Sequence, residues 1–262
     1  MTPDEHPAEP GEISDAKAAD EASDDAKNET GPKRVAVIMA HPDDPDFVCG
    51  GTCARWAAEG HHITFVLITN GDKGSDDRSI SGEELVRIRE AEQRAAAAIL
   101  GVQECVFMRR EDGVVVPNLE LRRELVRVIR QLKPDVVICQ DPTSWFVAQE
   151  YINHPDHRAA GQAVLEAIFP AARNHRMFPE LLAEGLETHR VEEVYVSTSQ
   201  NADTWIDISD YIDRKIQALR AHVSQMGDWD PDEPIREWNR EDGKKHDPPV
   251  EYAEDFRYFK LD

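Results

Sequence analysis

Basic residues are too few in this chain to balance its acidic residues. Its 262 residues include 30 Lys and Arg against 52 Asp and Glu, which gives a formal net charge of -22 at pH 7. Such a charge repels the phosphates of nucleic acids and the anionic surfaces of membranes, so we expect neither as the main partner. The balance favours a soluble protein whose substrate is neutral or cationic.

Long apolar runs and disulfide patterns are missing as well. No apolar stretch approaches the length of a membrane span, and no charged start is followed by an apolar run, so we expect neither a membrane anchor nor a secretory signal. The four cysteines form neither a disulfide framework nor a paired CxxC zinc site; they are Cys49, Cys53, Cys105 and Cys139. We therefore predict a cytoplasmic protein.

The first 32 residues differ in composition from the rest of the chain. Ten Asp or Glu occur there against Lys17 and Lys27, and the stretch has no apolar periodicity. Because such a segment cannot bury enough surface to offset the entropy of ordering, residues 1–32 are predicted to be a disordered acidic tail. The main domain is expected over 33–226.

The C-terminal extension, 227–262, has two parts. Residues 227–251 are rich in Asp, Glu, Pro and Lys, which predicts an extended, exposed loop. Residues 251–259, EYAEDFRYF, regain aromatic side chains, so this end is expected to pack on the domain or on a neighbouring subunit.

Apolar, β-branched runs alternate with helical patterns from Lys33 onward. The runs predict strands at 34–40, 62–69, 104–108, 135–139 and 191–199. The intervening patterns predict helices at 50–59, 82–100, 119–132, 156–172 and 209–226, the last capped by Ser209. This alternation indicates an α/β, Rossmann-like, doubly wound fold: a mostly parallel sheet with helices on both faces.

A glycine-rich phosphate loop is absent from the position where this fold would need one. The turn after the first strand contains AHPDDPDF (40–47), with an imidazole and three carboxylates, at His41, Asp43, Asp44 and Asp46. A nucleotide-binding protein would place backbone amides there, so that class is disfavoured. Crowded carboxylates repel one another unless a cation lies among them, although an exposed turn with helix-capping aspartates is the simpler alternative.

A second histidine cluster, NHPDHR (153–158), follows the fourth predicted strand. It contains His154 and His157 near the start of a helix. In the common doubly wound order, strands one and four are neighbours at the topological switch point, where ligands bind beyond the carboxyl ends of the strands. The two clusters therefore favour a metal site at the C-terminal ends of strands 1 and 4.

At these residues the chain resembles the N-acetylglucosaminyl deacetylase superfamily, also called LmbE-like or PIG-L proteins. The shared features are AHPDD (40–44), GGT (50–52) and HPDH (154–157), and the likeness extends over about 34–226. TNGDKGS (69–75) and RAHVSQ (220–225) also resemble family segments. Many members carry Glu just after AHPDD, where this chain has Pro45 and Asp46, so the role of Asp46 stays open.

The resemblance implies a zinc-dependent deacetylase of small molecules that contain N-acetylglucosamine. It implies that His41, Asp44 and His157 ligate Zn²⁺, that Asp43 is the general base and that His154 stabilises the oxyanion. Two imidazoles and one carboxylate leave an open fourth position on zinc, as catalytic sites do. Next to His154, Asp156 is expected either to hold the tautomer of that histidine or to cap the helix.

Substrate contacts follow from the resemblance and from the loops. Arg89 and Asp112 lie in segments that line the substrate pocket of relatives. Trp145, between the fourth strand and HPDH, is expected to border the pocket and stack on a sugar, although it could equally pack the loop or a subunit contact. Relatives often form homo-oligomers, sometimes hexamers, in which a neighbour's loop closes the pocket, and 227–251 could serve as that loop.

Two other functions remain open on the sequence alone. One is a zinc-dependent amidase or esterase that acts on a non-sugar N-acyl substrate. The other is a binding module that has kept the fold and lost the catalytic activity. The presence of Asp43, His154 and all three candidate ligands argues against it.

Overall fold

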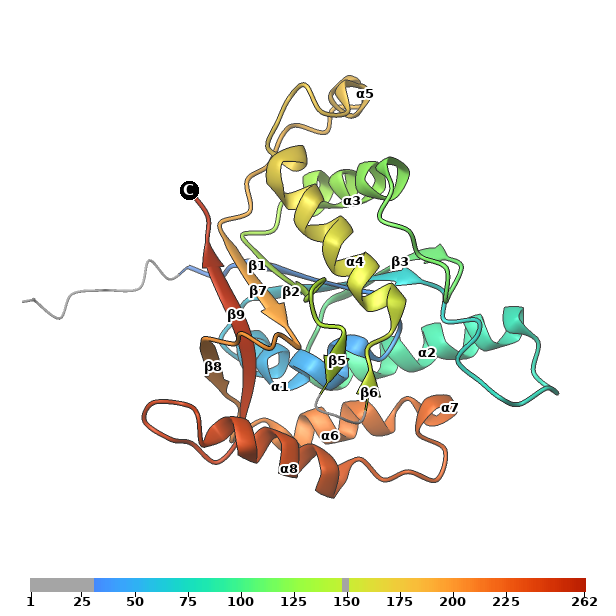
Figure 1. Cartoon of the computed structure of the whole chain (residues 1–262), viewed down its shortest axis with the longest axis vertical. Helices are drawn as coiled ribbons and strands as arrows, with labels where there is room; N and C mark the ends of the chain where they lie inside the picture. The colour runs from blue at the N-terminus through green and yellow to red at the C-terminus, as the bar shows by residue number, and fades with distance from the viewer. Residues whose placement is uncertain (1–30, 148–150) are drawn as a thin grey trace, which may run out of the picture. The chain divides into compact units, whose positions relative to one another are not determined.

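A seven-stranded, mostly parallel sheet forms the centre of the computed structural model, which describes residues 31–147 and 151–262 (Figure 1). The parallel strands, in sheet order, are β3 (Glu104–Arg110), β2 (His62–Thr69), β1 (Arg34–Met39), β4 (Val136–Gln140) and β7 (Glu193–Ser197). All five predicted strands are confirmed, with small shifts at their ends. Pro32–Asp262 form one compact unit. The predicted acidic tail, apart from its last two residues, lies outside the described ranges.

The order of the parallel strands puts β1 beside β4. Val35 pairs with Val136 and Ile38 with Cys139, both in parallel register. The two strands lie between apolar layers, and every residue of β1 after Arg34 is buried. The predicted switch point between strands 1 and 4 is therefore present, and the chain leaves both strands at the same edge of the sheet.

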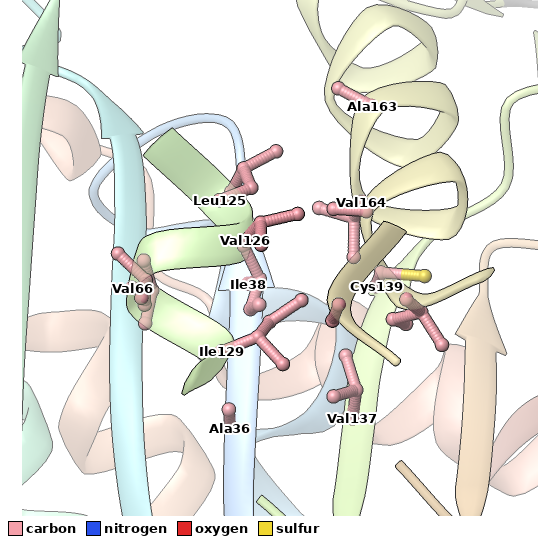
Figure 2. Packing of buried hydrophobic residues seen from close by; sticks show 14 of the residues in the cluster. Ala36, Ile38, Val66, Leu125, Val126, Ile129, Val137, Cys139, Ala163 and Val164 are labelled. Carbon is pink, nitrogen blue, oxygen red and sulfur yellow. The ribbon is translucent and has the colours of Figure 1, made fainter. Parts of the chain in front are cut away.

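Helices cover both faces of the sheet, as predicted for a doubly wound fold. One face packs against α3 (Leu119–Leu132), α4 (Pro155–Glu166) and the π-helical segment η1 (Ala167–Ala172). Figure 2 shows α3 side chains, among them Ile129, next to Ile38 of β1 in this layer. The other face packs mainly against α1 (Asp44–Ala58), α2 (Gly82–Leu100) and α6 (Ile212–Arg220).

Local signals explain where the surface helices begin and end. The Ser81 side chain accepts a hydrogen bond from the Glu84 N–H and caps α2, while Gly101 ends it in the left-handed conformation at φ 81°. Asn118 caps α3 in the same way through the Leu121 N–H. Both helices match their predicted boundaries.

Three predicted helices need correction. The first begins at Asp44 rather than at 50, with a kink at Cys49. The helix predicted over 156–172 is α4 followed by η1, in which Phe169 is non-helical before Pro170. The stretch predicted as one helix over 209–226 contains α6 and the short α7 (Val223–Met226).

Ser209 does not cap α6. Its backbone N–H and its hydroxyl both bond the Asp207 carboxylate, and the residue before α6 is Tyr211, which makes no side-chain cap. The Ser209 hydroxyl is therefore engaged in the turn before the helix rather than at its first free amides.

The C-terminal extension is more ordered than its composition indicated. The prediction of an extended, exposed loop over 227–251 was wrong, because α8 (Asp232–Gly243) forms there and buries Ile235 and Asn239. The next segment is strand β9 (Ala253–Lys260), which lies antiparallel between β7 and β8 (Thr204–Asp207). The expectation that this end packs back on the domain is confirmed.

The remaining elements are short. They are the hairpin of β5 (Phe146–Val147) and β6 (Tyr151–Ile152), and helix α5 (Pro179–Ala183). Among the described residues, none of the helices combines the length and apolar character that a membrane crossing requires.

Candidate metal centre

Two loops at the carboxyl edge of the sheet carry the candidate site. The turn between β1 and α1 holds His41 and Asp43, and Asp44 is the first residue of α1; the second loop ends at His154, the N-cap of α4, and His157 lies in the first turn of that helix. Because β1 and β4 are paired neighbours, these loops leave the sheet side by side. The structure thus brings together all five residues that the sequence placed at one crevice.

Donor groups of three residues converge on one point of this crevice. The Nδ1 atom of His41 lies 3.2 Å from His157 Nε2 and 3.3 Å from Asp44 Oδ2, and the other Asp44 oxygen lies 3.1 Å from His157 Nε2. Tetrahedral ligands about 2.0–2.1 Å from a zinc ion lie about 3.3–3.4 Å from one another. The spacing and chemistry of these donors therefore fit a single zinc-sized ion.

Carboxylates also surround the far side of the His41 ring. Its Nε2 atom lies 3.0 Å from Asp112 Oδ1 and 3.5 Å from Asp156 Oδ2. Burial opposes the imidazolium charge, but the carboxylates of Asp44, Asp112 and Asp156 outweigh it and raise the pKa of His41 to about 12. His41, Asp112 and Asp156 could by distance form a metal group of their own. We favour the Nδ1 side, because carboxylates on the opposite nitrogen are the usual orienting partners of a metal-binding histidine.

Further hydrogen bonds orient the other two donors. Asn153 Oδ1 lies 2.9 Å from His157 Nδ1, which leaves Nε2 of that ring for a metal. Asp44 Oδ2 accepts hydrogen bonds from the His41 N–H at 2.7 Å and from Gln140 Nε2 at 3.0 Å. Sequence reasoning missed Asn153 and Gln140, although the position of Asn153 directly before HPDH was an available signal.

Asp43 has an unusual backbone conformation. Its φ of 100° is a region that residues with a side chain rarely adopt, so the surrounding contacts must hold it. The Asp43 N–H donates to Gln93 Oε1 at 2.7 Å, and Arg89 donates to the Pro42 carbonyl at 2.6 Å. Burial, opposed by the Arg89 guanidinium 3.2 Å away, raises the pKa of Asp43 to about 6.

Asp46, whose role the sequence left open, lies completely buried beneath the same turn. Its Oδ2 atom accepts a hydrogen bond from Gln93 Nε2 at 2.7 Å and lies 3.1 Å from His222 Nε2. A continuous chain of contacts thus runs from His222 through Asp46 and Gln93 to the Asp43 backbone. Asp46 supports the turn and is not one of the converging donors.

His154 lies over the donor atoms, with its ring centroid 4.7 Å from that of His41. Its Nδ1 atom accepts a hydrogen bond from the Asp156 N–H at 3.2 Å, so the ring proton of the neutral form is on Nε2. Burial and the neighbouring His41 lower the pKa of His154. A neutral His154 is therefore already a donor at Nε2.

Of the two expected roles of Asp156, it holds the tautomer of His154, but through its backbone N–H and not through its carboxylate. The carboxylate accepts hydrogen bonds from the Gly113 and Val115 N–H groups and lies near His41. The expected capping role was wrong. The cap of α4 is His154 itself.

The three residues expected to contact substrate differ in their surroundings. Arg89 is 3% exposed and lies under the Asp43 turn, and Asp112 is 5% exposed beside His41. Trp145 is 57% exposed, and the Arg158 guanidinium lies 3.7 Å from its ring centre. Of the three, Trp145 alone offers a broad accessible face.

Comparisons with known proteins agree with this geometry. Residues 36–168, which include both clusters, match the family model PIG-L: GlcNAc-PI de-N-acetylase. The diacetylchitobiose deacetylase of Thermococcus kodakarensis is 34% identical over 76% of this chain and 74% of its own length. A probable N-acetyl-alpha-D-glucosaminyl L-malate deacetylase 2 of Bacillus anthracis is 30% identical over 76% of this chain and 83% of its own.

A solved structure shows the same fold. The N,N'-diacetylchitobiose deacetylase of Pyrococcus horikoshii superposes with a TM-score of 0.80 at 29% identity, covering 87% of this chain and 84% of that one. The chain therefore belongs to the PIG-L family of deacetylases. The family predicted from AHPDD and HPDH is confirmed.

Proposed function

We propose that this protein is a zinc-dependent hydrolase that removes the acetyl group from small molecules containing N-acetylglucosamine. The observation that carries the proposal is the convergence of His41 Nδ1, His157 Nε2 and the Asp44 carboxylate within 3.1–3.3 Å of one another, with Asp43 and His154 beside them. The relatives named as deacetylases of diacetylchitobiose and of an N-acetylglucosaminyl malate support the substrate class.

Each residue of the site has a separate role in the reaction. Zinc held by His41, Asp44 and His157 would supply a Lewis acid and lower the pKa of water toward neutrality. Asp43 accepts a proton as water attacks the amide carbon, and it returns that proton to the leaving nitrogen. His154 donates from Nε2 to the oxygen that becomes negative. The water oxygen becomes bonded to the acetyl carbon, and the C–N bond then breaks. The products are acetate and a free amine.

Other residues act through these groups. We infer that Arg89 positions Asp43 and that Asp112 orients His41, since both are nearly buried against those residues. Trp145 is the proposed substrate contact, because its exposed ring lies in the loop that ends at Asn153 and His154.

The test combines metal analysis with acetate release. We expect about one zinc per chain and release of acetate from N-acetylglucosaminides, but little from simple N-acyl amines. His157→Ala should lose both metal and activity, whereas His175→Ala, which removes an exposed histidine between η1 and α5, should lose neither. Full zinc content in folded His157→Ala would contradict the ligand assignment, and faster release from simple N-acyl amines would favour a non-sugar amidase.

We also propose that the protein is cytoplasmic and self-associates. Four free thiols support a reducing compartment, and the exposed apolar side chains Val114, Val116 and Leu119 offer a surface for a second copy. Light scattering of the wild type should give a multiple of the 29.6 kDa chain mass. The double variant Val116→Asp, Leu119→Asp should have a lower measured mass. A monomeric wild type would refute self-association.

A further inference from the structure

A cavity of about 590 Å³ lies between the β5–β6 hairpin and α8. Its walls are Phe146 and Val147 of β5, Trp238 and Asn239 of α8, Phe47 of α1 and the stretch 198–200 after β7. Figure 1 shows the hairpin above α8, and both elements line this cavity. We call it the α8 cleft. None of the five residues assigned to the metal centre lines it.

Two walls of the α8 cleft begin at the metal centre. Phe47 is one helical turn beyond Asp44 on α1. Ser144, which lines the cleft, accepts a hydrogen bond at its carbonyl from Asn153 Nδ2 at 2.7 Å, and Asn153 Oδ1 contacts His157 Nδ1. The cleft therefore adjoins the reaction site on the helix side and on the hairpin side, where the rest of a substrate would extend.

The chemistry of the lining favours a carbohydrate. Trp238 is 55% exposed, and Phe146 is 57% exposed, so both present apolar ring faces to a ligand. Asn239 donates from Nδ2 to the Ala253 carbonyl, which ties the α8 wall of the cleft to β9.

The charges of the lining indicate which sugars fit. Lys215 and Lys245 face three carboxylates, those of Asp242, Glu254 and Asp255. Lys215 is paired with Glu254 at 2.7 Å, and Lys245 with Asp242 at 2.9 Å, so neither cation is available to an anionic ligand without breaking a pair. A neutral or cationic group is favoured over a carboxylate or phosphate.

We propose that the α8 cleft binds the distal sugar of an oligosaccharide substrate, a neutral or amine-bearing hexose linked to the N-acetylglucosamine unit at the metal centre. This inference rests on the proposed function and narrows its substrate class. It favours a disaccharide or longer chain, of the kind named for the Thermococcus relative, over an acidic conjugate such as the malate glycoside named for the Bacillus relative.

The experiment compares substrates of different length in the zinc-loaded full chain. Trp238→Ala should lower kcat/KM for N,N'-diacetylchitobiose about tenfold, equivalent to about 1.4 kcal/mol, and leave the value for monomeric N-acetylglucosamine unchanged. Phe169→Ala, which removes a 59% exposed aromatic ring from a different surface, is the matched control and should change neither value. Wild type should also prefer diacetylchitobiose to N-acetylglucosaminyl malate.

Three results would overturn the proposal. They are an equal effect of Trp238→Ala on monomer and dimer, a preference for the malate glycoside, and a change in the mass of the assembly on Trp238→Ala, which would make the cleft a subunit contact. If wild type deacetylates none of these sugars, the proposed function fails instead. The cleft is then tested by tryptophan fluorescence during titration with diacetylchitobiose. Quenching should be smaller in Trp238→Phe than in Trp145→Phe, and equal quenching in Trp238→Phe and wild type would overturn the cleft assignment.

Discussion

Asn153 offers a sharp test of how the metal centre is held. Its Oδ1 atom, 2.9 Å from His157 Nδ1, fixes the ring so that Nε2 faces Asp44 and His41, and its side chain is almost completely buried. Asn153→Ala removes this acceptor and leaves the Nδ1 proton without its partner. Loss of such an orienting contact typically weakens metal affinity about 10–100-fold, which corresponds to about 1.4–2.7 kcal/mol.

The same side chain makes a second contact, which the experiment must separate from the first. Asn153 Nδ2 donates to the Ser144 carbonyl, so Asn153→Ala also loosens the hairpin loop. Asn153→Asp keeps an acceptor for His157, although it loses the Ser144 bond and adds a buried negative charge. We therefore expect Asn153→Asp to hold zinc within about threefold of wild type, while Asn153→Ala shows the full loss.

The assay is competition for zinc against a chromophoric chelator, with thermal unfolding of each zinc-free variant measured in parallel. Asn118→Ala is the matched control, because it removes a side-chain hydrogen bond at the start of α3 and should lower stability by about 1 kcal/mol without altering zinc affinity. Zinc affinity unchanged in folded Asn153→Ala, or equal losses in the Ala and Asp variants, would refute the orienting role.

Three further predictions concern catalysis and the packing behind the site. Asp43→Asn should retain zinc but lower kcat by about 10²–10⁴, as measured by acetate release; loss of zinc would instead make Asp43 a ligand. Gly51→Ala should destabilise the fold by about 1–3 kcal/mol in urea unfolding, because a Cβ there would lie 2.6 Å from Ile208 Cδ1, and wild-type stability would contradict this packing. Lys215→Met should cost about 3–5 kcal/mol, because it leaves Glu254 charged and buried, and the double variant with Glu254→Gln should recover part of that loss; no recovery would argue against the pair.

The parallel sheet and the convergence of the two histidine clusters could be predicted from the sequence. Buried parallel strands are continuous apolar runs, and their alternation with helices leaves few topologies, which is why β1 and β4 were expected side by side. The C-terminal helix could not be recognised in the same way. Residues 232–243 are mostly charged, and the helix is stabilised by tertiary burial of Ile235 and Asn239 rather than by its own apolar stripe.

The spacing of residues around Arg89 is a sequence pattern that indicates the role of this side chain. Leu85, Arg89 and Gln93 are spaced by four residues on α2, and all three are buried, so the two polar side chains lie on the face that packs against the domain. A polar residue on an apolar helical face requires hydrogen-bond partners, which here are the Asp43 turn and Asp46. That pattern indicates support of the turn rather than contact with substrate.

The C-terminal segments and the metal centre depend on one another through α1. The kink at Cys49 frees the Gly51 and Thr52 N–H groups, and the Glu254 carboxylate of β9 accepts hydrogen bonds from both, at 2.9 and 2.7 Å. A carboxylate at such freed amides acts as a helix N-cap, so β9 holds the second part of α1 in place.

At the first turn of the same helix, His222, which precedes α7, contacts Asp46 beneath the strained Asp43 turn. Elements that follow residue 200 thus support α1 both at its first turn and at its kink. Because Asp43 lies beside the metal donors at a φ of 100°, which surrounding contacts must hold, the part of the chain beyond the family match at 168 contributes to the geometry of the site that the match contains.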